Sequence, residues 1–236
     1  MLSQNDFATW SKDYVLFCHI TTHVEGDPHQ DLLGKKGGRG FPHMVFMDGE
    51  GNVLAQHEGP RSLDGFSTTA EEAVETRQEL AMLDGKAAQG DAAAGKEAFL
   101  LRLDLGHFDA GQALAHMARL PFTDEEKKEL DSAVASLEVM EVLSGLTEDE
   151  EGILAAGKHF AGMMAKGRCP GEEEMQPFYL ITLRYAESAK DAKVFRAALD
   201  GLKVTLAEMM DNPAVTQYLE EQEKALAEIE KSPAGG

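Results

Sequence analysis

The sequence contains little cysteine and no long apolar run. Only two of its 236 residues are cysteines, Cys18 and Cys169, and no Cys-x-x-Cys pair occurs anywhere. A disulfide-stapled scaffold is therefore excluded, because such folds need several closely spaced cysteines. No stretch approaches the roughly 18 consecutive apolar residues of a membrane-spanning helix, so we expect no membrane partner.

Positive charge is also scarce. Lys and Arg total 22 against 42 Asp and Glu, which gives a formal net charge of −20. A nucleic-acid-binding surface needs clustered Lys and Arg, because phosphate contacts supply much of its affinity. The charge balance thus argues against nucleic acid or an anionic membrane as a partner, and its simplest consequence is solubility.

The first residues lack both features of a secretory leader. Residues 1–6 contain no basic side chain and open no apolar stretch of the kind that a signal peptide carries. We therefore expect a cytoplasmic location for the chain as it stands. The expectation becomes periplasmic or secreted if an N-terminal segment was removed.

The two parts of the chain differ in pattern. Residues 1–66 predict a mixed α/β module, and residues 67–236 predict an all-α domain of antiparallel helical hairpins. The α/β part alternates β-branched and aromatic runs with turn sequences, whereas the rest is rich in alanine at helical spacing. The expected elements of the α/β part are a helix at 3–12 capped by Ser3, a buried strand at 14–20, a helix at 28–36 after Asp27, a strand at 43–48, a tight turn at 48–51 and a strand at 52–59.

Capping signals mark helix starts in the second part. A Thr followed three residues later by Glu is typical of a helix N-terminus, because each side chain satisfies a backbone N–H of the other residue. The signal occurs at Thr68 and Thr69, at Thr123 and at Thr147. Further along the chain, helices are expected at 92–105, 110–119, 124–144, 148–166, 173–188, 191–210 and 213–231.

One stretch of the first part resembles the thioredoxin-like fold family. The run from Gly40 to Gly51 reads GFPHMVFMDGEG, and it matches the family pattern of Gly, an apolar residue and Pro before a strand and a turn. The resemblance implies a cis peptide bond at Phe41–Pro42 and a thiol–disulfide oxidoreductase ancestry. It also implies that Gly40, Phe41, Pro42 and His43 form an edge that receives an extended peptide.

The resemblance covers only the C-terminal portion of that fold. Family enzymes carry Cys-x-x-Cys upstream of the strand that matches residues 14–20, and only 13 residues precede that strand here. We therefore predict a catalytically silent protein with no cofactor, and Cys18 is the one weak catalytic candidate. The alternative is a non-enzymatic adaptor that binds a protein or peptide, or a homodimer that completes the partial sheet.

The remaining Cys and His residues suggest weaker alternatives. Cys18, His19, His23 and His29 offer metal-ligand chemistry, but strand alternation would point Cys18 away from the histidines, so we predict no metal site. We expect Cys18 to be a buried structural thiol. Cys169, next to Arg168, is expected to be an exposed loop thiol.

Residues 101–121 resemble one tetratricopeptide-type helical hairpin. Small and aromatic residues stand near that repeat's positions, namely Gly106, Phe108, Gly111, Ala115, Ala118 and Pro121. No clean second copy follows at a 34-residue period. An ordinary helical hairpin explains the pattern equally well.

Overall fold

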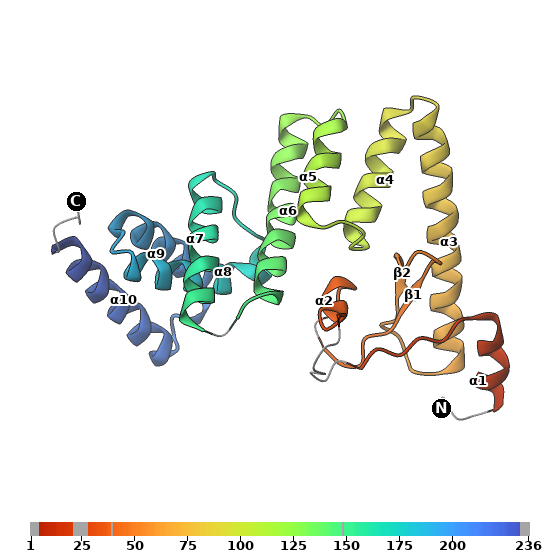
Figure 1. Cartoon of the computed structure of the whole chain (residues 1–236), viewed down its shortest axis with the longest axis horizontal. Coiled ribbons are helices and arrows are strands. Elements are labelled where there is room, and N and C mark those ends of the chain that lie inside the picture. Colours follow the sequence, from red (N-terminus) through yellow and green to blue (C-terminus); the bar gives the residue numbers. More distant parts are fainter. Residues whose placement is uncertain (1–4, 21–27, 39, 148, 232–236) are drawn as a thin grey trace. The chain divides into compact units, whose positions relative to one another are not determined.

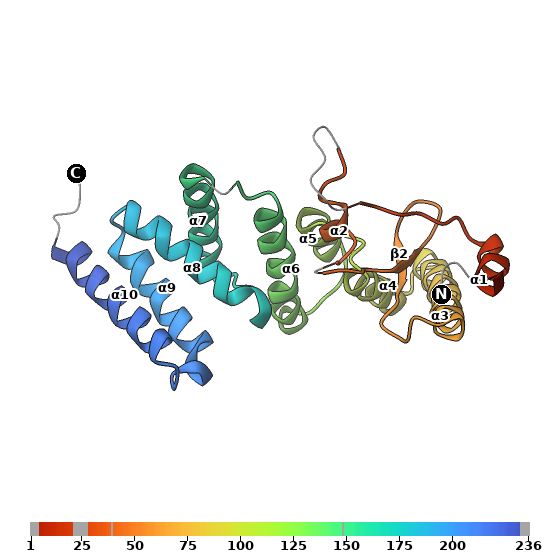
Figure 2. The same ribbon diagram turned by 90° about the horizontal axis from the view of Figure 1, so that it is seen from below.

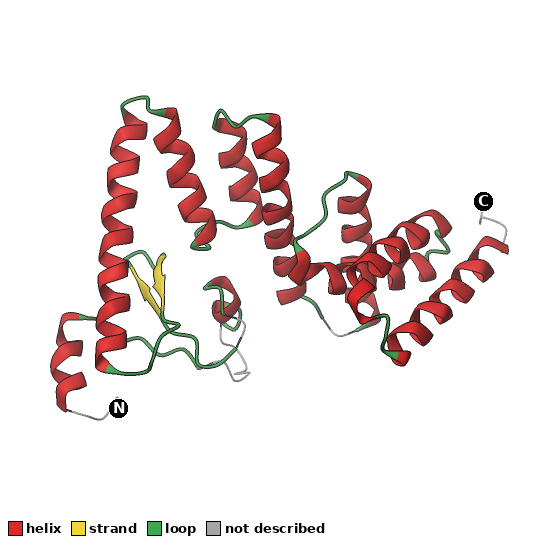
Figure 3. Ribbon diagram, turned by 180° about the vertical axis from the view of Figure 1, so that it is seen from behind, coloured by secondary structure: helices red, strands yellow, loops and turns green. Residues whose placement is uncertain are grey.

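The computed structural model describes residues 5–20, 28–38, 40–147 and 149–231. Over these residues the chain is mostly helical, with one small antiparallel sheet of two strands (Figure 1, Figure 3). Backbone proximity divides it into two compact units, Met1–Phe122 and Thr123–Gly236. The predicted division at 66/67 differs from this boundary, because the first long helix packs on the sheet. A separate domain over residues 1–66 stays a prediction.

The sheet of the first unit is a hairpin of strands β1 (Val45–Met47) and β2 (Val53–Gln56). The strands are antiparallel, with Phe46 opposite Ala55 and an irregularity after Phe46. The Asp48 carboxylate accepts hydrogen bonds from the backbone N–H groups of Glu50 and Asn52, each at 2.9 Å. Gly51 supplies the positive φ of 85° that closes the turn. The predicted turn at 48–51 is thereby confirmed, between strands shorter than predicted.

Helix α3 (Leu63–Ala88) packs along β2, beside the hairpin (Figure 2). Its N-cap is Ser62, whose hydroxyl accepts the N–H of Gly65 from an extended backbone. The predicted starts at Thr68 and Thr69 were wrong. Both lie inside the helix, and the hydroxyl of each donates a hydrogen bond to the carbonyl four residues earlier. A Thr in this position does not cap the helix.

The other helices of the first unit are shorter. Helix α4 (Ala92–Asp104) is capped by Asp91, and α5 (Ala110–Arg119) begins with a capping box of Asp109 and Gln112. Near the N-terminus, α1 (Asn5–Trp10) continues into a 3-10 turn, Ser11–Asp13. The predicted helix at 28–36 is reduced to the single turn of α2 (Leu32–Lys35). The predicted caps Ser3 and Asp27 lie outside the described residues.

Residues 14–20 do not form the predicted buried strand. They run as irregular chain, and most of their apolar side chains face solvent, with Val15 98% exposed. The Tyr14 ring is anchored, with its centroid 4.5 Å from that of Trp10 and 5.7 Å from that of Phe46. A strand is stable only where a neighbour pairs with its backbone, and no described strand pairs with this segment.

The second unit consists of helices throughout its described length. The helix bounds match the predicted ones closely, and consecutive helices from α7 to α10 pack against one another. Thr123 and Glu126 form the predicted capping box, whereas Asp149 takes the cap position expected of Thr147. The elements are α6 (Asp124–Ser144), α7 (Glu150–Ala165), α8 (Glu172–Ser188), α9 (Ala192–Thr205), a 3-10 turn (Ala207–Met209) and α10 (Pro213–Lys231).

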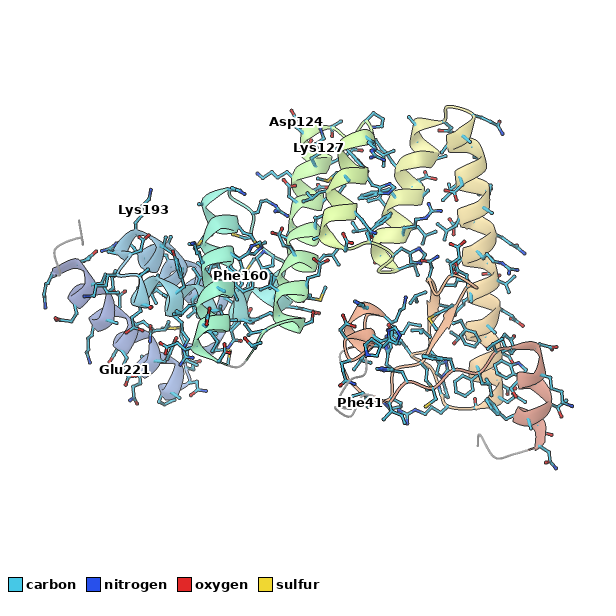
Figure 4. The ribbon with its side chains drawn as sticks, viewed as in Figure 1. Phe41, Asp124, Lys127, Phe160, Lys193 and Glu221 are labelled. Atoms are coloured by element: carbon cyan, nitrogen blue, oxygen red, sulfur yellow. The ribbon has the colours of Figure 1, made fainter. Side chains whose placement is uncertain are left out.

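The core of the second unit is aromatic at its centre. Figure 4 labels Phe160 on α7. Phe160, Phe178 of α8 and Phe195 of α9 are fully buried, and the centroids of the Phe160 and Phe178 rings lie 5.2 Å apart. Leu199 and Leu202 extend this cluster along α9. Across the part of the chain that the structure describes, no helix has both the length and the apolarity needed to cross a bilayer.

Candidate peptide-binding site

The Phe41–Pro42 corner stands directly before β1. Its peptide bond is cis, as predicted. Gly40, Phe41 and Pro42 are exposed, with Phe41 at 71%, and His43 is half-buried (Figure 4). The four residues predicted to receive a peptide thus form one short, accessible segment. That they bind a peptide stays a prediction.

Helix α2 holds this corner in place. The His43 Nε2–H donates to the carbonyl of Lys36 at 2.8 Å, and the Lys36 ammonium donates to the carbonyl of Gly51 at 2.5 Å. The N–H of Gly38 closes α2 by donating to Leu33 at 2.8 Å. The end of α2 is therefore tied both to the start of β1 and to the turn after it. The sequence analysis missed Lys36, because no local pattern shows which distant carbonyl a lysine will reach.

Strand β1 has one open edge, and its central residue contacts the beginning of the exposed apolar segment. Among the described residues β1 pairs only with β2, so its second edge has no strand partner. Phe46, at the centre of β1, contacts Trp10 and Tyr14, with ring centroids 6.4 and 5.7 Å apart. These rings place the beginning of segment 14–20 beside the strand. An unpaired edge next to exposed apolar side chains is a receptive site for an extended polypeptide.

A buried histidine links the sheet to α3. The Nδ1 of His57 lies 2.8 Å from the Thr69 hydroxyl, which itself donates to the carbonyl of Gly65 at 3.2 Å. The ring stacks on Phe66 with a centroid distance of 4.5 Å. His57 therefore fixes the end of β2 to the first turns of α3.

The two cysteines do not match their predicted environments. Cys18 is exposed rather than buried, because segment 14–20 forms no strand that would cover it. Cys169 lies in a loop, as expected, but is half-buried, and the Tyr179 hydroxyl donates to its Sγ at 3.9 Å. Burial and the neighbouring Cys169 raise the pKa of Tyr179 to about 12, so its phenol is protonated at neutral pH.

The early histidines do not assemble a metal centre in the described residues. No group of three or more His, Cys, Asp or Glu side chains there has a ligand-like arrangement. His19 is half-buried and His29 lies in the turn before α2. His23 lies outside the described residues.

Comparisons with known proteins return no match for this chain. No family model, no curated protein and no solved structure is similar to it.

Proposed function

We propose that this chain is a non-enzymatic protein-interaction module that self-associates through segment 14–20. In this proposal the first unit is a partial thioredoxin-like fold, and a second copy supplies the strand that its sheet lacks. The observations that support the proposal are the exposed apolar side chains of segment 14–20, which contains no Asp, Glu, Lys or Arg, the contact of its Tyr14 ring with Phe46 of β1, and the second edge of β1, which no described strand pairs with. Association of the first units of two copies would then bring two all-helical second units into one dimer.

Energetics favour a partner at this place. A two-stranded hairpin alone is marginally stable in water, and the packing of α3 on β2 already supplies the further element that it needs. Segment 14–20 leaves Val15, Leu16, Phe17 and Ile20 largely in water. Burying a side chain of this type contributes roughly 1.5–3 kcal/mol, so covering several of them outweighs a moderate cost of ordering.

Charge favours a second copy as that partner. The chain carries a net charge of −20, so most of its surface repels another copy. Segment 14–20 contains no Asp, Glu, Lys or Arg, and its residues are strand-forming in type. Two copies that pair antiparallel about a two-fold axis would each cover the other's apolar side chains in a closed interface.

The test is the oligomeric state of the full chain. We expect light scattering after size-exclusion chromatography to give twice the chain mass of 25.6 kDa. Replacing Val15→Asp together with Phe17→Asp should give a monomer, because paired strands would then bury four carboxylates. Val204→Asp is the matched control, since Val204 on α9 is 77% exposed and belongs to the second unit.

Three outcomes would refute the proposal. The first is a monomer at high concentration for the unmodified chain, and the second is equal dissociation by the Val204→Asp control. A polydisperse aggregate would also contradict a closed dimer, because open-ended pairing of exposed strands produces aggregates.

The exposed thiol of Cys18 supports a second candidate function, thiol–disulfide exchange. Catalytic turnover needs a thiolate and a resolving thiol within reach. We expect the chain to reduce insulin disulfides no faster than its Cys18→Ser variant. A faster rate of insulin reduction than that of the variant would establish an oxidoreductase and refute the proposal of a non-enzymatic module.

A further inference from the structure

Four of the eight residues that line a hollow of about 430 Å³ in the second unit are basic. One wall is a face of α7, and Glu138 of α6 and the segment after α7 complete it. Three permanent cations face a single carboxylate there, in a chain where acidic residues outnumber basic ones almost two to one. The lining residues are Glu138, Ala155, Lys158, His159, Gly162, Met163, Lys166 and Arg168.

Glu138 orients two of the basic groups. The His159 Nε2–H donates to its Oε1 at 2.7 Å, and the Arg168 Nη1 lies 2.6 Å from its Oε2. The Nε and Nη2 of Arg168 have no hydrogen-bond partner among the described residues. The guanidinium is thus held by one ion pair, and two of its buried nitrogens are left without an acceptor.

The two lysines leave an opening between them. Lys158 and Gly162 of α7 and its C-cap residue Lys166 follow one another at intervals of four, so the two lysines flank Gly162 on one side of the helix. A Cβ at Gly162 would meet nothing within 4 Å. Neither lysine has an ion-pair partner among the described residues. Basic residues often stabilise a helix C-terminus, which explains Lys166 and Arg168, but this explains neither Lys158 nor the gap at Gly162.

We infer that this hollow binds a phosphate monoester. The two lysines, Arg168 and Glu138 together give the lining a net charge of about plus two, which balances the charge of −1.5 to −2 on a phosphomonoester at neutral pH. Guanidinium and ammonium donors together are the usual ligands of phosphate oxygens in proteins. The group comes either from a small phosphorylated metabolite or from a phosphorylated side chain of a partner protein.

Titration calorimetry of the full chain with inorganic phosphate and with a phosphoserine peptide tests this inference. We expect saturable binding of both probes and weaker binding as salt is raised. Tighter binding of the peptide assigns the site to a protein partner, and tighter binding of free phosphate assigns it to a small molecule. The double variant Lys158→Gln, Lys166→Gln should weaken phosphate binding at least tenfold, because it removes both ammonium groups that have no ion-pair partner among the described residues.

A variant that fills the hollow distinguishes a loss of phosphate binding from a loss of folding. Gly162→Met adds a side chain in open space within a helix, so the variant should melt at the same temperature or higher and yet lose phosphate binding. Gly85→Met on α3 is the matched control, because Gly85 is also helical with open space around it. The control should bind phosphate as the unmodified chain does.

Three results would overturn the assignment. One is the absence of saturable phosphate binding by the unmodified chain. Another is undiminished binding by a folded Gly162→Met variant. The third is equally tight binding of succinate, which would show a general preference for dianions rather than for phosphate.

Discussion

The two units bury their apolar residues in different ways. In the second unit, one cluster of fifteen buried residues joins five helices, with Phe160, Phe178 and Phe195 at its centre. In the first unit the buried apolar residues fall into smaller groups, such as the four around Leu54 and the three around Leu83. There a further apolar segment, 14–20, stays in water.

The difference has a backbone cause. A helix satisfies its own N–H and C=O groups, so it needs only a neighbour for its apolar face. A strand needs a neighbour for its backbone as well, and residues 14–20 have no such neighbour among the described residues. The helical unit therefore covers its own apolar face, while the sheet of the first unit presents an open edge.

The largest effect is expected from Phe160→Ala. Removing a fully buried phenylalanine costs roughly 3–5 kcal/mol of unfolding free energy through lost burial and a new cavity. Chemical denaturation followed by circular dichroism measures this loss. Trp10, the only tryptophan, reports on the first unit, and its fluorescence transition should not move. A shift of both transitions together would show that the two units unfold as one.

Phe41→Ala, at an exposed position, is the control and should change stability by less than about 0.5 kcal/mol.

A smaller effect is expected from Asp48→Ala in the hairpin turn. Burial opposes ionisation of Asp48, but hydrogen bonds from the Asn52 side chain and from the N–H groups of Asn52 and Glu50 outweigh it, so its pKa is lowered. Losing these bonds should cost about 1–2 kcal/mol, as measured by denaturation with Trp10 fluorescence.

The same lowered pKa predicts the dependence on pH. The contribution of Asp48 is fully present above its unfolded pKa of about 3.9 and is lost as the pH falls through the lower folded value. The stability difference between the unmodified chain and Asp48→Ala should therefore shrink in acid. A difference that persists at a pH below the folded pKa would contradict the assignment.

The smallest effect compares two equivalent helix turns, one in each unit. Gly90 between α3 and α4 and Lys190 between α8 and α9 both have positive φ, at 94° and 53°, and each precedes a capping Asp. A side chain is disfavoured in this conformation, so Lys190→Gly should stabilise the second unit by about 0.5–1 kcal/mol, and Gly90→Ala should destabilise the first by a similar amount. Thermal unfolding measures both, and a loss of stability in Lys190→Gly would contradict the comparison.

Most of the helical structure could be predicted from local signals. The bounds of α5, α6 and α10 agree with the predicted ranges. The signals that define these helices, their end residues and the periodic apolar positions, all lie within the helix itself or directly beside it. The start of α3 was missed, since Ser62 and Thr68 are both acceptable caps and only the packing of Phe66 under the sheet distinguishes them. The turn after β1 was predictable for the same local reason.

The candidate sites were less accessible to sequence reasoning. The exposed corner from Gly40 to His43 could be found from its family-like pattern, although its ties to Lys36 could not. The basic hollow gave no signal, because Glu138 stands about twenty residues before Lys158 and about thirty before Arg168. A charge pattern in sequence does not show which helices will meet.

By itself the sequence determined the helices, the tight turn and the acidic character of the chain, because each depends on residues close together or on composition alone. Only the tertiary structure decided that residues 14–20 form no strand, that Cys18 is exposed and that three cations share one hollow. These properties depend on which distant backbone or side chain comes near. That choice is made by the packing of the whole unit, and no short stretch of sequence contains it.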